Sequence, residues 1–289
     1  MIRYLSSLKI LAFLFNTVCL AVSPMHWDET QVQEYIHHSE LQRLSTWQLL
    51  STIDLKGSEN ILDVGCGDGR NSAWMALTVR NGSVHGIDPN DAMLSWAKKQ
   101  YHPIDFPNLT FEKGSFDNLG NDLSYDIVTS FFSIHCVQDK KKAMQEVYRV
   151  LKESGRFICV APPPPTSNML YFQAVCDVIK TDKWKSYFET FSPRFHFTQL
   201  EDYKEAIIDA GLKLDSAKYV KTIDPFVNDA EFVNWFKGTM PHRQYLPKDL
   251  QDEFVYDIIK IYTNLCPDAR GPDNTLRLFW GRFELTASK

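Results

Sequence analysis

A glycine-rich turn between two apolar runs has the residue types needed to hold an adenosine-containing ligand. It follows residues 61–64 and contains three glycines in the spacing G-x-G-x-G: Gly65, Gly67 and Gly69. Glycines leave backbone N–H groups bare, so that a ligand can approach them without meeting side chains. Asp88 ends the next apolar run, 19 positions after Gly69, where its carboxylate can accept hydrogen bonds from both ribose hydroxyls.

The details of this turn favour one adenosine cofactor over another. Dinucleotide-binding turns follow G-x-G-x-x-G, in which the third glycine lets helix and strand pack closely around a pyrophosphate. Here that glycine comes one position earlier. Asp63, two positions before Gly65, would repel a pyrophosphate but attract the ammonium group of a methionine moiety. The turn therefore favours S-adenosylmethionine (SAM).

The segments ILDVGCGDG and GIDPN resemble the first two motifs of class I SAM-dependent methyltransferases. The resemblance implies that Asp63 and the backbone at Gly65 and Gly67 hold the methionine part, and that Asp88 binds the ribose. It also implies that Ser115 and Phe116 contact the adenine by a hydrogen bond and by stacking. The other cofactor residues that we expect are Cys66, Pro89 and Ser130.

These motifs require a sheet whose strands alternate with helices. Hydrophobic patterns predict helices at 40–52 and 92–100, and another that carries Met144, Val147, Val150 and Leu151. Strands are predicted at 61–64, 83–87, 109–112, 125–130, 156–161, 212–221 and 275–287. By resemblance, the last two form an antiparallel pair. We expect an α/β fold with a Rossmann-like, doubly wound, seven-stranded sheet and helical cap insertions.

Two aromatic-rich insertions, at about 162–200 and 224–273, interrupt this pattern. The first begins with four prolines, which end the fifth predicted strand. Aromatic residues at helical spacing are typical of a plain core, but both insertions follow the ligand-binding ends of strands. We therefore expect two helical lids on a single domain that spans 25–289.

Residues expected near the methyl acceptor lie after the fourth strand, in the lid and near the N-terminus. His135 occupies the position that faces the transferred methyl in the resembled family and is our catalytic candidate; the alternative is a structural histidine. Arg243 could make a charge-assisted contact with a carboxylate, with Arg194 in reserve, although arginines are common on surfaces. The other expected substrate-binding residues are Trp27, Tyr35, Cys136 and Tyr245.

A wider resemblance points to the class of acceptor. The chain from Trp27 onward resembles trans-aconitate methyltransferases, and residues 125–157 resemble juvenile hormone acid methyltransferases. Both families esterify carboxylates, so we expect a small-molecule carboxylic acid as the acceptor. A carboxylate is already ionised at pH 7 and needs neither a metal nor a general base. Cys136 stands where both families usually have a tryptophan. The particular acid that either family methylates is therefore not assigned to this chain.

Two other functions remain open. One is N- or O-methylation of another metabolite with His135 as general base. The other is a SAM-binding interaction protein that does not turn over. Nucleic acid is disfavoured as a partner, because the net charge is −5, the pI is about 5.9 and the sequence has no basic stripe. We interpret the short basic run at 139–142 as the solvated start of a helix.

Residues 1–24 resemble a leader segment. The apolar run at 10–22 is too short for a comfortable membrane span but matches the core of a signal peptide. Against export, SAM is made inside cells, and the five cysteines after Cys19 form no disulfide framework. We expect a cytoplasmic monomer whose translation starts at Met1 or Met25, with export or membrane anchoring through residues 1–24 as the alternative.

Overall fold

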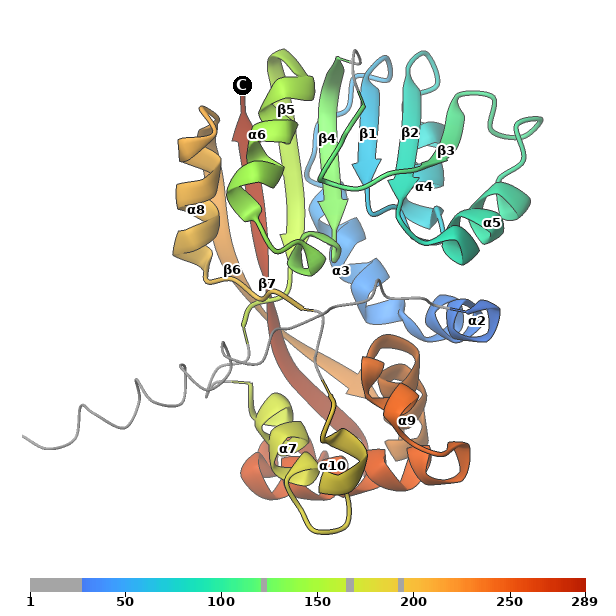
Figure 1. The fold of residues 1–289 in the computed structure, drawn as a ribbon, viewed down its shortest axis with the longest axis vertical. Helices are drawn as coiled ribbons and strands as arrows, with labels where there is room; N and C mark the ends of the chain where they lie inside the picture. Colours follow the sequence, from blue (N-terminus) through green and yellow to red (C-terminus); the bar gives the residue numbers. More distant parts are fainter. Residues whose placement is uncertain (1–27, 121–123, 165–168, 192–194) are drawn as a thin grey trace, which may run out of the picture.

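The computed structural model describes residues 28–120, 124–164, 169–191 and 195–289. A seven-stranded mixed sheet runs through the molecule (Figure 1). Its strands, in spatial order, are β3 (Leu109–Lys113), β2 (Ser83–Asp88), β1 (Asn60–Val64), β4 (Tyr125–Phe131), β5 (Leu151–Ala161), β7 (Leu276–Ser288) and β6 (Lys213–Phe226). The first five are parallel, and β7 runs antiparallel to both of its neighbours. The predicted fold is confirmed.

Helices cover both faces of the sheet and bury two separate apolar clusters. One face packs against α3 (Glu40–Leu50), α4 (Arg70–Thr78) and α5 (Asp91–Gln100). The other packs against α6 (Lys140–Val150) and α8 (Leu200–Asp209). This double cover explains the continuous apolar runs of the central strands, because parallel strands are buried on both sides.

The fifth strand begins earlier than its sequence pattern indicates. We predicted it from 156 and placed Leu151 on the preceding helix, but α6 ends at Val150 and Leu151 pairs with Tyr125 of β4. Ser154 has a positive φ of 64°, and the register shifts in this part of the ladder. An irregular strand start of this kind breaks the alternation on which the prediction depended.

A cap is built on a long antiparallel arm that extends beyond the parallel strands. The pairing of β5 with β7 ends at Ala161 opposite Phe283, whereas β6 and β7 stay paired as far as Phe226 opposite Leu276. The predicted second lid began at 224, but residues 224–226 belong to β6. Figure 1 shows the arm running from the sheet into α7 (Leu170–Ile179), α9 (Asp229–Thr239) and α10 (Gln251–Leu265).

The cap has its own apolar core, which is rich in aromatic rings. Phe232, Trp235 and Phe236 of α9 are buried with Phe254 and Tyr262 of α10. Short 3-10 turns complete the chain: η1 (Ile134–Cys136), η2 (Lys185–Phe188), η3 (Pro241–Tyr245), η4 (Lys248–Leu250) and η5 (Pro267–Ala269). The aromatic residues of the insertions therefore form much of a third apolar cluster, separate from the two on the faces of the sheet.

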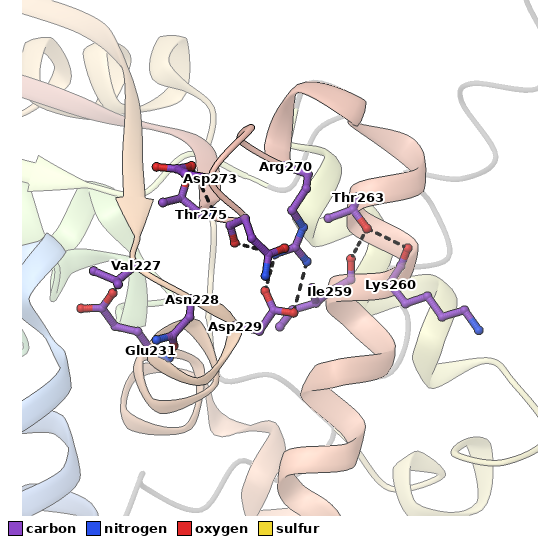
Figure 2. A network of polar contacts seen from close by, with 11 residues as sticks. Val227, Asn228, Asp229, Glu231, Ile259, Lys260, Thr263, Arg270, Asp273 and Thr275 are labelled. Atoms are coloured by element: carbon purple, nitrogen blue, oxygen red, sulfur yellow. Dashed lines mark hydrogen bonds and ion pairs between the residues drawn. The ribbon is translucent and has the colours of Figure 1, made fainter.

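Polar contacts fasten the start of α9 to the chain before β7 (Figure 2). Nη1 and Nη2 of Arg270 donate to the two carboxylate oxygens of Asp229 at 2.6 and 3.2 Å. The side chain of Asn228 accepts from the amide of Glu231, and the Glu231 carboxylate accepts from the amide of Val227. The bidentate pair and the helix cap fix the orientation of α9.

One helix, which the sequence pattern does not predict, lies between the cap and the sheet. α2 (Glu29–His38) begins with a capping box made by Asp28 and Gln31. It approaches α9 closely, because a Cβ on Gly238 would lie 2.8 Å from both the carbonyl oxygen of Glu34 and the Cβ of His38. Its only buried residue is Val32, which explains the weak sequence signal.

No helix within the described ranges is long and apolar enough to cross a membrane. The predicted leader at 1–24 lies outside these ranges.

Candidate active site

Hydrogen bonds join the glycine turn after β1 to the end of β2. The amides of Gly65 and Cys66 donate to the carbonyl oxygen of Ile87 at 2.8 and 3.0 Å, and the Gly67 amide donates to Asp88 Oδ2 at 2.9 Å. Gly65 has φ of 77°, and a Cβ there would lie 2.2 Å from the Cβ of Ser133. Gly67 has φ of 56°, and a Cβ there would meet no atom of the described residues within 4 Å. Gly67 thus presents bare backbone to open space.

Three nearly buried carboxylates surround this turn. Asp63, Asp68 and Asp88 are 1%, 5% and 9% exposed. Asp63 accepts hydrogen bonds from Ser72 Oγ at 2.6 Å and Thr129 Oγ1 at 2.8 Å, while Asp68 forms an ion pair with Arg70.

Burial and mutual repulsion perturb two of these acids. Loss of solvent raises the pKa of Asp63 to about 6, with a further rise from the Asp68 carboxylate. Burial likewise raises the pKa of Asp88 to about 6, with Asp63 and Asp68 adding to it. Arg70 forms its ion pair with Asp68, while Asp63 and Asp88 are held by neutral donors, so the turn has excess negative charge and attracts a cationic ligand.

α2 lies against the same turn. Arg70 Nη2 donates to the carbonyl oxygen of Ile36 at 2.9 Å, which ties the start of α4 to α2. Burial and the Asp68 carboxylate raise the pKa of Tyr35 to about 12, so this predicted substrate residue lies beside the acidic cluster. Trp27, the other N-terminal candidate, falls outside the described residues.

The chain turns sharply where β4 ends. Phe132 has a positive φ of 51°, and its amide donates to the carbonyl oxygen of Val160 at 2.8 Å. The hydroxyls of Ser130 and Ser133 share a hydrogen bond of 2.7 Å, and Ser133 Oγ donates to the carbonyl oxygen of Val64 at 2.8 Å. These contacts hold η1, which carries His135, next to the glycine turn.

His135 is a buried, neutral histidine between two aromatic rings. His135 is 8% exposed, and the centroid of its ring lies 4.9 Å from that of Phe195 and 5.7 Å from that of Phe197. Nδ1 has no hydrogen-bond partner among the described residues. Burial, with a smaller contribution from Lys140, lowers its pKa to about 3. The next residue, Cys136, is exposed.

The residues predicted to bind adenine follow β3. The Ser115 hydroxyl accepts from the Asp117 amide at 3.3 Å. Phe116 is buried in the same apolar cluster as Ile87 and Leu119. Pro89 is exposed directly after Asp88.

Arg243, predicted to contact the acceptor, already has a carboxylate partner. It forms an ion pair with Glu34 of α2, and its side chain is 11% exposed. It also lines a small hollow between α2, η3 and the end of α9, together with Gln31, Phe195, Lys237 and Met240. Tyr245 instead packs into the cap, with its ring centroid 5.0 Å from that of Phe191. The reserve candidate Arg194 lies outside the described residues.

Several residues at this edge were missed from the sequence. The hydroxyls of Ser72 and Thr129 give no signal by themselves, because many serines and threonines lie near strand and helix ends. Arg70 directly follows the glycine turn, which could have marked it as a partner for Asp68. Within the described parts of the chain, no three His, Cys, Asp or Glu residues are grouped so that they could hold a metal ion.

Comparison with known proteins agrees with this geometry. Residues 55–192 match the methyltransferase domain family. Juvenile hormone acid O-methyltransferase of Drosophila melanogaster is 26% identical over 252 residues, which cover 81% of this chain and 83% of that protein. The chain is a SAM-dependent methyltransferase. The methyltransferase also resembles solved structures in fold. YcgJ of Bacillus subtilis has a TM-score of 0.60 at 20% identity, over 86% of this chain and 98% of that one.

SAM suits the charge and shape of the site. Phosphoethanolamine N-methyltransferase 2 of Haemonchus contortus, solved in complex with SAM, has a TM-score of 0.58 at 17% identity, over 93% of this chain and 60% of that one. In the methyltransferase described here, the open space at Gly67 leaves room for a ligand. The surplus carboxylates fit the ammonium and sulfonium groups of SAM.

Proposed function

We propose that the methyltransferase transfers the methyl group of SAM to a carboxylate oxygen of a small-molecule acid. One observation carries this proposal: His135 is neutral and buried, its Nδ1 has no hydrogen-bond partner in the described part of the chain, and it follows β4 at the edge where open α/β sheets bind ligands. A neutral imidazole can donate one N–H bond to an acceptor oxygen and so orient it.

A carboxylate acceptor demands little acid–base chemistry from the protein. Its pKa of about 4 leaves it ionised at neutral pH, so no general base is needed. SAM supplies the methyl group for an in-line displacement. The protein has to hold the acceptor oxygen about 3 Å from the methyl carbon and keep water away. Phe195 and Phe197, which flank His135, would form a dry wall for this step.

The likeness to a juvenile hormone acid O-methyltransferase supports an acid as the acceptor, since that protein is named for one. Arg243 could bind the carboxylate while it remains paired with Glu34, because a guanidinium has five N–H donors. We keep Tyr35, Cys136, Tyr245 and Trp27 as proposed lining residues.

On the cofactor side, we propose that Asp88 accepts hydrogen bonds from the ribose hydroxyls. Each of its oxygens already accepts one amide, from Gly67 or Asn90, and keeps a lone pair for a hydroxyl. Asp63, with the backbone at Gly65, Cys66 and Gly67, would hold the methionine part. The other proposed contacts come from Pro89, Ser115, Phe116 and Ser130. Stacking by Phe116 would require its buried ring to turn outward.

A second reaction would use the same histidine as a general base. Because its pKa is lowered to about 3, His135 is neutral at neutral pH and has a free lone pair for a proton from an amine or hydroxyl, but the same shift makes it a weak base. The pH dependence of kcat separates the two reactions. For a carboxylate acceptor, we expect kcat to be flat above about pH 6; a rate that follows ionisation of the acceptor's own N–H or O–H would favour the second reaction.

The deciding experiment offers purified protein labelled SAM and a panel of mono-, di- and tricarboxylic acids, with base-labile methyl ester as the product measured. We expect ester with at least one acid and at least a tenfold loss of kcat/KM in His135→Ala. Label that appears only in base-stable products would contradict esterification. SAM binding without any product across acids, amines and alcohols would instead favour a non-catalytic binding protein. We propose that the protein is a monomer and, because SAM is made inside cells, that it is cytoplasmic.

A further inference from the structure

Lys140, interpreted from sequence as part of a solvated helix start, is in fact buried. The residue is only 7% exposed, although it begins α6 within a run of three lysines. Its neighbour Lys141 follows the sequence expectation, with a side chain that is 64% exposed and paired with Asp209. Burying a lysine is costly unless its ammonium finds hydrogen-bond acceptors.

The acceptors of Lys140 belong to two segments that are far apart in sequence. Its Nζ donates to the carbonyl oxygen of Val137, directly after η1, and to that of His196 at 2.8 Å. In the opposite direction, the His196 amide donates to the carbonyl oxygen of His135 at 2.7 Å. The amide and the carbonyl oxygen of His196 thus both take part in hydrogen bonds that join residues 195–198 to the chain after β4.

This tie determines what surrounds the His135 ring. Phe195 and Phe197 flank His196 in sequence, and both rings contact His135. If residues 195–198 moved away, His135 would lose both aromatic neighbours and the burial that keeps it neutral. The Lys140 ammonium itself lies 6.0 Å from the Tyr203 ring, which adds a weak cation–π contact.

The charge state of Lys140 suits this role. Burial lowers its pKa to about 8, while the nearby Cys136, Cys159 and Asp139 oppose that shift. At neutral pH it therefore remains mainly an ammonium, with three N–H donors for two carbonyl oxygens.

We propose that Lys140 is a positioning residue of the acceptor site, which holds residues 195–198 against the turn that carries His135. The inference rests on the proposed function, because it takes His135 as the acceptor side. Lys140 acts through Phe195 and Phe197 and touches neither SAM nor acceptor. The acceptor pocket would then have a wall, formed by Phe195 and Phe197, whose position depends on Lys140.

The first test needs no acceptor. Hydrogen exchange at the His196 amide reports whether residues 195–198 stay docked, since that amide donates to His135. In Lys140→Met we expect this amide to exchange about tenfold faster, while the amides of β1 and β2 keep their protection. Lys141→Met is the matched control and should change neither. Unchanged exchange at His196 in Lys140→Met would overturn the proposal.

The second test uses any acid that proves to be methylated. Lys140→Met should raise the KM for that acid about tenfold and leave the Kd for SAM within about twofold, because the glycine turn is untouched. Lys140→Arg, which retains a cation, should restore part of the loss. If KM stays at the wild-type value although His196 exchanges faster, the role at the acceptor site is excluded.

Two precautions separate the possible failures. If Lys140→Met does not fold, as lost protection in β1 would reveal, Lys140→Gln replaces it, because glutamine is too short to bridge the two carbonyl oxygens. If no acid is methylated, the proposed function fails but the exchange experiment still decides whether Lys140 docks residues 195–198.

Discussion

At the scale of single residues, the cofactor end of the site is dominated by carboxylates that water hardly reaches. The sequence identified Asp63 and Asp88 because their distance from the glycines is constrained by the turn itself. It could not reveal the hydroxyls of Ser72 and Thr129 that hold Asp63, since these come from a helix and a strand brought together only by folding. Nor could it separate buried Lys140 from exposed Lys141.

Asp88→Ala tests the ribose contact. We expect SAM to bind about thirtyfold more weakly, a loss of about 2 kcal/mol, because hydrogen bonds to a charged carboxylate disappear. Titration calorimetry measures the change. Asp91→Ala is the matched control, since this exposed residue begins α5 three positions later and forms an ion pair with Lys113. Equal SAM affinity in Asp88→Ala and wild type would remove Asp88 from the ribose site.

The raised pKa values of Asp63 and Asp88 predict how SAM binding depends on pH. Both pKa values are about 6 in the ligand-free protein, against an ordinary 3.8. The folded protein therefore binds protons more tightly than the unfolded chain. The stability gained in this way is fully present below pH 3.8 and is lost as pH rises through about 6. A cationic ligand favours the ionised acids. We therefore expect SAM affinity to fall as pH drops below about 6.

The slope should be up to about tenfold per pH unit for each proton displaced, and calorimetry across pH measures it. Asp63→Asn should reduce the slope, because it removes one of the two titrating groups. A SAM affinity that is constant from about pH 5 to pH 7 would show that SAM does not approach these carboxylates.

At the scale of elements, α2 joins two parts of the molecule through two arginines. Arg70 of α4 holds its backbone at Ile36, and Arg243 of η3 pairs with its Glu34 side chain. The sequence predicted the strands well because both faces of the sheet demand apolar residues. It missed α2, because a mostly polar helix that packs between two larger units has little amphipathic pattern.

The ion pair between Glu34 and Arg243 gives a test of the proposed carboxylate contact. Arg243→Ala should raise the KM for the acid about tenfold and leave SAM affinity nearly unchanged, because a charge-assisted hydrogen bond is lost. Glu34→Gln keeps the guanidinium and removes its competitor, so its KM should be equal to or below that of wild type. If both variants raise KM equally, the pair serves only to hold α2 against the cap.

At the scale of the whole molecule, the cap and the sheet share β6 and β7. The sequence predicted both strands and the insertion between them, but the length of the arm depends on pairing between residues that are 50 positions apart at its far end, Phe226 and Leu276. The sequence predicts helical lids from the aromatic-rich insertions. Most of the aromatic residues in α9 and α10 are buried in a core of the cap's own.

The shared strands predict that cap and sheet unfold together. Trp184, Trp235 and Trp280 are all buried in the cap cluster, and replacing Trp27, Trp47, Trp74 and Trp96 by phenylalanine leaves them as the only tryptophans. In urea, circular dichroism of the helices and tryptophan fluorescence of this variant should follow one transition with the same midpoint. A tryptophan transition that precedes loss of helix would show that the cap melts alone.

The paired arm also has a consequence for how the site could change in size. A cap joined by flexible loops could settle at any height, but two hydrogen-bonded strands allow only whole-residue steps. One residue added to each strand would turn the cap-facing side chains to the opposite face. Two added to each would restore the facing and carry the cap about 7 Å farther from the sheet. Pocket depth in enzymes built this way is therefore expected to vary in discrete increments, and strand length becomes a determinant of acceptor size.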